Sequence, residues 1–190
     1  MAASSYSIKK VAVLGAGVMG QGIAAHLANA GVPSVLYDIV PRDLPEGGDR
    51  SALARGGIAN AKKLKPASFF TTDAASLITP ANYEDDGALL GECDLIIEVV
   101  VEYLPIKKKV YEWVAANRSA TSIVTSNTSG IPLAAMAEGM PDSMRSHFLI
   151  THFFNPVRYM RLLEIVAGPD TDPAATAALV IATEHPDGSL

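Results

Sequence analysis

Three glycines near the N-terminus constrain the fold of this chain more than any other feature. They follow the pattern Gly-x-Gly-x-x-Gly over Gly15–Gly20. A short apolar run, Val11–Leu14, comes directly before them, and apolar residues between Val18 and Ala30 then recur at steps of three and four. Because a buried strand is short and apolar whereas a helix repeats about every 3.6 residues, this stretch predicts a strand, a tight turn and a helix.

A second apolar run, Val35–Tyr37, ends in Asp38 and completes a β-α-β unit. Asp38 follows Gly20 by 18 residues, near the spacing of about 20 at which an acidic residue accompanies this glycine pattern in dinucleotide-binding folds. Its carboxylate can accept hydrogen bonds from ribose hydroxyls but would repel a 2′-phosphate. The sequence therefore predicts a dinucleotide site that prefers NAD to NADP.

Each glycine of the pattern has its own physical reason. The first permits the tight turn, the second lets the backbone approach a pyrophosphate, and the third lets the helix pack closely on the strand. The N-terminus of the helix offers unpaired N–H groups to the phosphates. A glycine-rich turn that binds no ligand is the alternative. The residues expected to contact the cofactor are Gly15, Gly17, Val18, Met19, Gly20 and Asp38.

Strands and helices alternate along the rest of the chain. Further strands are expected at residues 94–101, 122–125, 148–154 and 162–166, and helices at 51–65, 104–116, 133–137 and 173–183. With 190 residues and 49% hydrophobic residues, the chain can bury a substantial core. The alternation favours a Rossmann-type α/β fold, a doubly wound and mostly parallel sheet with helices on both faces, over residues 1–190.

Composition argues against several other classes. The net charge is −5, and no stretch gathers enough Lys or Arg to follow a nucleic-acid backbone. The first apolar run is too short for a signal peptide or a membrane span, so a cytoplasmic protein is expected. Cys93 is the single cysteine and is expected to be a buried thiol. His147 precedes His152 by five residues without a zinc-binding pattern, so no metal is expected.

A second set of residues is more specific than the glycine pattern. His152–Pro156 reads His-Phe-Phe-Asn-Pro, Glu164 lies 12 residues beyond the histidine, and Ser126–Ser129 reads Ser-Asn-Thr-Ser at an expected strand end. A histidine in an apolar run is, by itself, more often a hydrogen-bonded core residue than a base. Together with the glycine pattern, in order and spacing, these motifs resemble the 3-hydroxyacyl-CoA dehydrogenase family over residues 8–181, and specifically its bacterial multidomain branch of fatty-acid β-oxidation.

This resemblance implies a set of catalytic roles. His152 corresponds to the base that takes the proton from the substrate's 3-hydroxyl while C3 gives a hydride to NAD. Glu164 corresponds to the carboxylate that orients the imidazole. Ser129 corresponds to the serine that hydrogen-bonds the substrate oxygen, and Asn127 to the asparagine near the nicotinamide and the substrate. The substrate implied is a 3-hydroxyacyl-CoA, or the 3-ketoacyl-CoA in the reverse direction.

The resemblance also assigns Glu102 and Lys107 to the cofactor site. The alternative for both is a solvated helix start with an acidic N-terminus and a lysine. Glu98 lies within an apolar strand, has no corresponding position in the family, and stays unassigned.

The chain departs from the family after the last expected helix. The family continues into a helical domain that closes the acyl pocket and often forms the dimer interface, and residues 184–190 do not resemble that continuation. We therefore expect the cofactor domain without the C-terminal helical domain, with exposed apolar surface that favours self-association or docking of the missing half. The alternatives are an NAD-binding module without catalysis of its own, and a β-hydroxyacid or 6-phosphogluconate-type dehydrogenase, which the His152–Pro156 motif disfavours.

Overall fold

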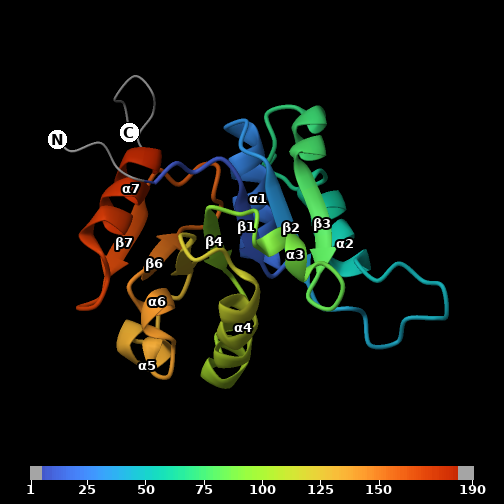
Figure 1. Ribbon diagram of the computed structural model, residues 1–190. Helices are drawn as coiled ribbons and strands as arrows, with labels where there is room; N and C mark the ends of the chain where they lie inside the picture. The colour runs from blue at the N-terminus through green and yellow to red at the C-terminus, as the bar shows by residue number, and fades with distance from the viewer. Residues whose placement is uncertain (1–5, 184–190) are drawn as a thin grey trace.

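The computed structural model describes residues 6–183, so the expectation for residues 184–190 lies outside the described residues. A seven-stranded sheet runs through the described residues and carries helices on both faces (Figure 1). The strands are β1 (Val11–Leu14), β2 (Ser34–Asp38), β3 (Ile78–Asn82), β4 (Leu95–Glu98), β5 (Ile123–Ser126), β6 (Phe148–Phe153) and β7 (Leu163–Ala167). The helices are α1 (Val18–Asn29), α2 (Ala52–Ala61), α3 (Gly87–Leu90), α4 (Leu104–Asn117), α5 (Leu133–Ala137), α6 (Asp142–Arg145), α7 (Pro173–Thr183) and the 3-10 helix η1 (Thr72–Leu77).

The strands are arranged in the order β3-β2-β1-β4-β5-β6-β7. Neighbours from β3 to β6 pair in parallel, and β7 pairs antiparallel with β6. The chain leaves β1 toward β2 on one side and later returns to β4 on the other, so the strand order reverses between β1 and β4. Ligands bind beyond the carboxyl ends of the strands at such a reversal. The doubly wound, mostly parallel sheet predicted from the sequence is confirmed.

The first strand shows why the sheet is buried on both faces. Val11 and Val13 pack into a cluster with residues of α1, α2 and α7, whereas Ala12 and Leu14 pack into a second cluster with residues of α3 to α6. Successive side chains of a strand point to opposite faces. All four side chains are completely buried, which is why the run is apolar throughout and does not alternate.

The sequence did not predict β3. This strand contains Pro80, which cannot donate a ladder hydrogen bond, and three of its five residues are Thr, Pro and Asn. It lies at the edge of the sheet and pairs only with β2. An edge strand tolerates proline and polar residues because one of its sides has no neighbouring strand, and its signal is correspondingly weak.

Two predicted elements end three or four residues earlier than expected. The helix expected to reach Lys65 ends at Ala61, consistent with the approaching Pro66, since the residue before a proline avoids the helical conformation. The strand expected to reach Val101 ends at Glu98. Beyond that point the Val100 N–H donates to the Glu98 carboxylate at 2.8 Å instead of to a neighbouring strand.

Candidate active site

The glycine turn between β1 and α1 has the geometry that a dinucleotide pyrophosphate needs. Gly15 has a φ of +115°, and a Cβ there would lie 2.8 Å from the Val99 carbonyl oxygen. A Cβ on Gly20 would lie 1.7 Å from the Gly15 carbonyl oxygen. Nothing lies within 4 Å of a Cβ built on Gly17, and no side chain caps the N-terminus of α1. The first and third glycines thus close the turn, and the second faces open space.

Asp38 lies beside this turn at the end of β2. Its Oδ2 accepts a hydrogen bond from the Ala16 N–H at 2.8 Å, and its Oδ1 accepts one from the Ile39 N–H at 2.7 Å. The sequence indicated a ribose-binding carboxylate but not the bond to Ala16. Asp38 therefore also holds the middle of the glycine turn in place.

A cleft of about 510 Å³ lies beyond the carboxyl ends of the central strands, within the usual range for small-molecule sites of about 300–1,000 Å³. It brings together eight of the predicted site residues: Gly17, Val18, Met19, Glu102, Lys107, Asn127, Ser129 and His152. Of the others, Gly15, Gly20 and Asp38 belong to the turn and strand behind it, and Glu164 lines a second cavity. The sequence missed the lining by Val99–Val101 and Phe153–Phe154, although both stretches lie at or just after strand ends, which was the available signal.

The predicted base and its carboxylate meet across two antiparallel strands. In the register of β6 and β7, His152 lies directly opposite Glu164, and cross-strand partners of this kind are close enough to interact. Nδ1 of the imidazole lies 2.9 Å from Oε2 of Glu164. A carboxylate at Nδ1 keeps the proton on that nitrogen, which leaves Nε2 as the proton acceptor. The Phe154 ring, 4.5 Å from the imidazole between centroids, packs against it.

The loop after β5 is fixed from two directions. Asn127 accepts a hydrogen bond from the Phe153 N–H at 2.8 Å, next to His152. The Thr128 hydroxyl donates to Oε1 of Glu102, and the Gly130 N–H lies 3.3 Å from the same oxygen. Partial burial on its own would raise the pKa of Glu102, but the Thr128 hydroxyl and the Lys107 ammonium outweigh it and hold that pKa below its usual range.

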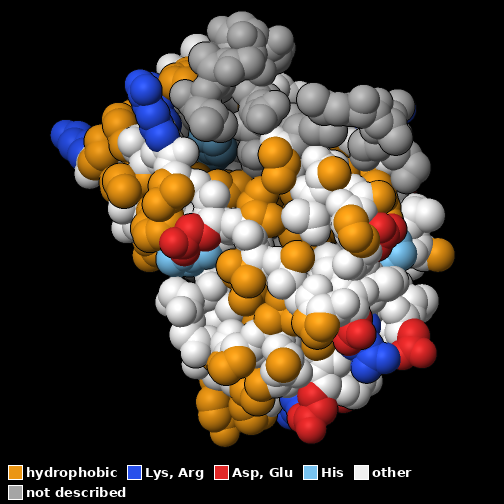
Figure 2. All heavy atoms as spheres, turned by 90° about the vertical axis from the view of Figure 1, so that its left-hand side faces the viewer, with side chains coloured by type: hydrophobic (Ala, Val, Ile, Leu, Met, Phe, Trp, Pro, Cys, Tyr) orange, Lys and Arg blue, Asp and Glu red, His pale blue; other side chains and the backbone are white. Residues whose placement is uncertain are grey.

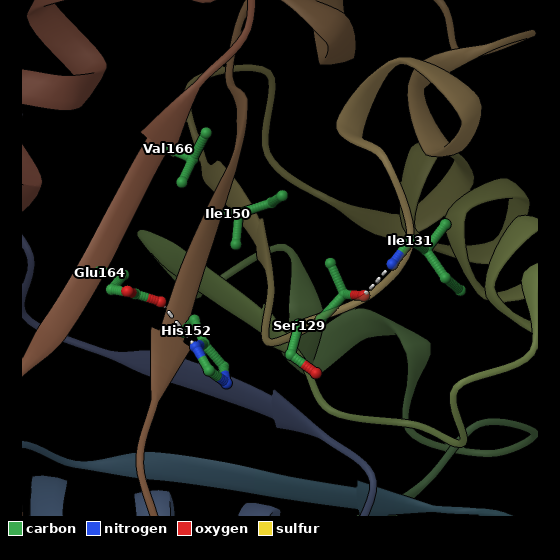
Figure 3. A pocket seen from close by; sticks show the side chains of 7 residues that line it. Ser129, Ile131, Ile150, His152, Glu164 and Val166 are labelled. Carbon is green, nitrogen blue, oxygen red and sulfur yellow. Dashed lines mark hydrogen bonds and ion pairs between the residues drawn. The ribbon is translucent and has the colours of Figure 1, made fainter.

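A second cavity, of about 170 Å³, adjoins this loop. Its apolar lining comes from Ile131, Ile150 and Val166. Figure 3 shows Glu164 on one side of the His152 imidazole and Ser129 on the other. His152 and Ser129 line both this cavity and the larger cleft. A proton acceptor and a hydroxyl therefore stand where the two spaces meet.

Lys107 lies in the wall of the larger cleft as a buried cation. Its side chain is 1% exposed, and its ammonium donates to Oε1 and Oε2 of Glu98 at 2.7 and 2.9 Å. The alternative of a solvated helix start is therefore wrong for Lys107, whereas Glu102 is 45% exposed. Burial and then the Glu98 charge raise the pKa of Tyr111, whose hydroxyl donates to Glu98.

Among the residues that the structure describes, no three His, Cys, Asp or Glu side chains are grouped so that they could hold a metal ion. Nδ1 of His147 lies 3.0 Å from the Ser143 carbonyl oxygen. None of the helices of residues 6–183 has both the length and the hydropathy for crossing a bilayer.

Comparison with known proteins gives matches over nearly the whole chain. The family model described as "3-hydroxyacyl-CoA dehydrogenase, NAD binding domain" matches residues 10–186. A probable 3-hydroxyacyl-CoA dehydrogenase of Bacillus subtilis is 51% identical over 177 residues, covering 87% of this chain and 22% of the relative. One of Deinococcus radiodurans is 44% identical over 178 residues, covering 94% of this chain and 51% of the relative. The chain thus spans about a fifth to a half of these curated relatives.

Solved structures agree with these matches. The crystal structure of 3-hydroxybutyryl-CoA dehydrogenase from Escherichia coli K12 superposes with a TM-score of 0.76 at 25% identity, over 93% of this chain and 36% of the other. That of (S)-3-hydroxybutyryl-CoA dehydrogenase from Ralstonia eutropha gives a TM-score of 0.74 at 27% identity, over 93% of this chain and 60% of the other.

Proposed function

Because the chain belongs to the family of 3-hydroxyacyl-CoA dehydrogenase NAD-binding domains, we propose that it carries the cofactor site and the base of an enzyme that oxidises 3-hydroxyacyl-CoA. The observation that carries this proposal is that His152 and Ser129 line both cavities. A hydride passes directly from one bound molecule to another, so the two must meet at one point. Among the described residues, His152 and Ser129 are the only base and hydroxyl that line both cavities, so they lie at that meeting point.

NAD, when bound, supplies the hydride acceptor. The open space in front of Gly17 and the uncapped start of α1 would hold its pyrophosphate. Asp38 would accept hydrogen bonds from the adenosine ribose, and Glu102 and Lys107 would border the part of the cleft nearer to His152. These residues fit a dinucleotide. A Cβ at Gly15 or Gly20 would collide with backbone atoms, so these two glycines permit the tight turn, and the space in front of Gly17 is open to a pyrophosphate.

The chemical step needs a base that accepts the 3-hydroxyl proton and later releases it. His152 would accept the 3-hydroxyl proton at Nε2, and Glu164, 2.9 Å from Nδ1, would stabilise the resulting imidazolium. The Ser129 hydroxyl would donate to the substrate oxygen. Asn127, fixed by its bond to the Phe153 N–H, would position the substrate relative to the nicotinamide.

The described residues supply only part of the wall that we propose for the acyl group of the substrate. A cavity of about 170 Å³ is smaller than the roughly 300 Å³ at which ligand pockets usually begin. We therefore propose that a helical domain supplies the remaining walls of the acyl pocket. A cytoplasmic location is a separate part of the proposal. Hydrophobic side chains gather on the face that carries β7 and α7 (Figure 2). Met160 and Leu162, just before β7, and Val166, within it, are exposed. Docking of such a domain, or self-association, would cover them.

The second candidate function is an NAD-binding module without turnover of its own. The same small cavity favours it, because the described residues form the glycine turn and a cleft of about 510 Å³, whereas the second cavity, of about 170 Å³, is too small for an acyl pocket. Sedimentation would reveal self-association in either case.

Acetoacetyl-CoA reduction, followed by NADH absorbance, tests the proposal alongside a separate NADH-binding titration. We expect His152→Gln to lower turnover about 10²- to 10⁴-fold with NADH affinity unchanged. His147→Gln is the matched control, because His147 precedes β6 and contacts Ser143 rather than either cavity. NADH binding without turnover would favour the module, and undiminished turnover of His152→Gln would remove His152 from the mechanism.

A further inference from the structure

Glu98 is a carboxylate to which neither the sequence nor the proposed reaction gives a role. It ends β4, between β1 and β5, and is completely buried. Four groups donate to its two oxygens at 2.6 to 2.9 Å. They are the Val100 N–H, the Lys107 ammonium, the Tyr111 hydroxyl and the Ser126 hydroxyl. A buried charge with such a complete set of partners has a single fixed position.

From Glu98 a chain of polar contacts leads to the proposed catalytic loop. The Lys107 ammonium that pairs with Glu98 also lies 3.3 Å from Oε2 of Glu102. Through its other oxygen, Glu102 binds the Thr128 hydroxyl and the Gly130 N–H, the residues on either side of Ser129. The Glu98 carbonyl oxygen accepts from the Asn127 N–H at 2.8 Å. Both ends of the loop are thus tied to Glu98, one directly and one through Lys107.

Stability of the fold does not by itself account for this arrangement. A buried ion pair is often no more stabilising than well-packed apolar residues of similar volume, because both charges must be removed from water. The next residue of α4, Lys108, pairs at 2.7 Å with Glu138, which follows α5. That pair is exposed, and neither of its residues lines the cleft. The buried pair, in contrast, has its cation in the cleft wall.

We propose that Glu98 is a positioning residue, which holds Lys107 in the cofactor cleft and, through Lys107 and Glu102, fixes the loop that presents Ser129. The inference deepens the proposed function and rests on it for the identity of the site. Without the Glu98 charge, Lys107 has Glu102 as its remaining carboxylate partner and moves toward it. The loop then loses the fixed cation that sets the position of Glu102.

The test compares four variants: Glu98→Gln, Lys107→Met, the double variant of both, and Glu138→Gln as the exposed control. Three quantities are measured in each: thermal unfolding, NADH affinity by fluorescence, and amide hydrogen exchange of residues 127–130 without ligand. Glu98→Gln leaves a buried cation short of its counter-charge, and we expect a fall in unfolding temperature on the order of 10 °C. We also expect a rise in the NADH Kd of about tenfold or more and faster exchange of the loop.

The double variant separates positioning from stability. Removing both charges eliminates the unpaired buried ion, so the unfolding temperature recovers, while the NADH Kd and the loop exchange stay raised. Recovery of all three quantities would overturn the proposal, as would a Glu98→Gln variant with the affinity and exchange of the unchanged chain. Because no measurement uses a CoA thioester, loss of dehydrogenase activity refutes only the proposed function. The exchange measurement decides the inference even for a chain that does not bind NADH.

Discussion

Replacement of Gly20 by alanine, compared with replacement of Gly17, tests the close packing of the glycine turn. A Cβ on Gly20 would lie 1.7 Å from the Gly15 carbonyl oxygen, and real Cβ atoms essentially never come within 3.0 Å. The start of α1 must therefore move by at least 1.3 Å, the difference between the two distances. Alanine would otherwise stabilise a helix by about 1 kcal/mol, so the sign of the effect depends on the collision alone.

The expected loss is large because the collision is with backbone. Overpacking of a buried site costs about 1–3 kcal/mol and occasionally more. We expect the upper end, about 3 kcal/mol, since no flexible side chain can give way. For a chain of this length that corresponds to roughly 6–12 °C in unfolding temperature. Gly17, with a φ of −67° and open space around its Cβ position, should tolerate alanine within about 1 kcal/mol.

Urea unfolding followed by the fluorescence of Trp113 measures both variants, because this residue, the single tryptophan, packs against Tyr37 and Tyr83. NADH titration provides the second comparison. Gly17→Ala should unfold normally but bind NADH at least about tenfold more weakly, because its methyl group occupies the space proposed for the pyrophosphate. A Gly20→Ala protein as stable as the unchanged chain would refute the packing argument. Normal NADH binding by Gly17→Ala would refute the proposed position of the phosphates.

Four further outcomes are expected, two of them for Cys93. Asp38→Ala should reduce the discrimination between NADH and NADPH in binding titrations, because it removes the charge that repels a 2′-phosphate; an unchanged affinity ratio would contradict this account of specificity. Glu164→Gln should lower acetoacetyl-CoA turnover on the order of 100-fold with NADH affinity intact, with Glu138→Gln as an exposed control, and equal loss in both variants would count against the pairing with His152. Burial raises the pKa of the Cys93 thiol to about 11, so a disulfide reagent at pH 8 should react with it only after unfolding. Fast labelling of the native chain would contradict the burial. The raised thiol pKa also means that the folded state keeps a proton that the unfolded state releases, so the free energy of unfolding should fall between about pH 9 and pH 11.

The sequence predicted local features well where one interaction dominated. The run Val11–Leu14 is apolar because its strand is covered on both faces, and this short-range signal located β1 correctly. The strand β3 was missed because an edge position, which only the assembled sheet defines, removes the demand for apolar residues and permits Pro80. The ends of α2 and β4 were misplaced for a similar reason, since the boundaries depend on what the next residues contact.

By itself the sequence determined the doubly wound fold, the family, and the identity of the cofactor, because spacing and residue type carry these over short distances. Only the tertiary structure showed that Glu98 and Lys107 form a buried ion pair. The local sequence places Glu98 in an apolar run, but nothing in it indicates that Lys107 is buried beside it as a partner. The difference arises because β1, β5 and α4 close around the end of β4, and desolvation of two charges is a property of that enclosure.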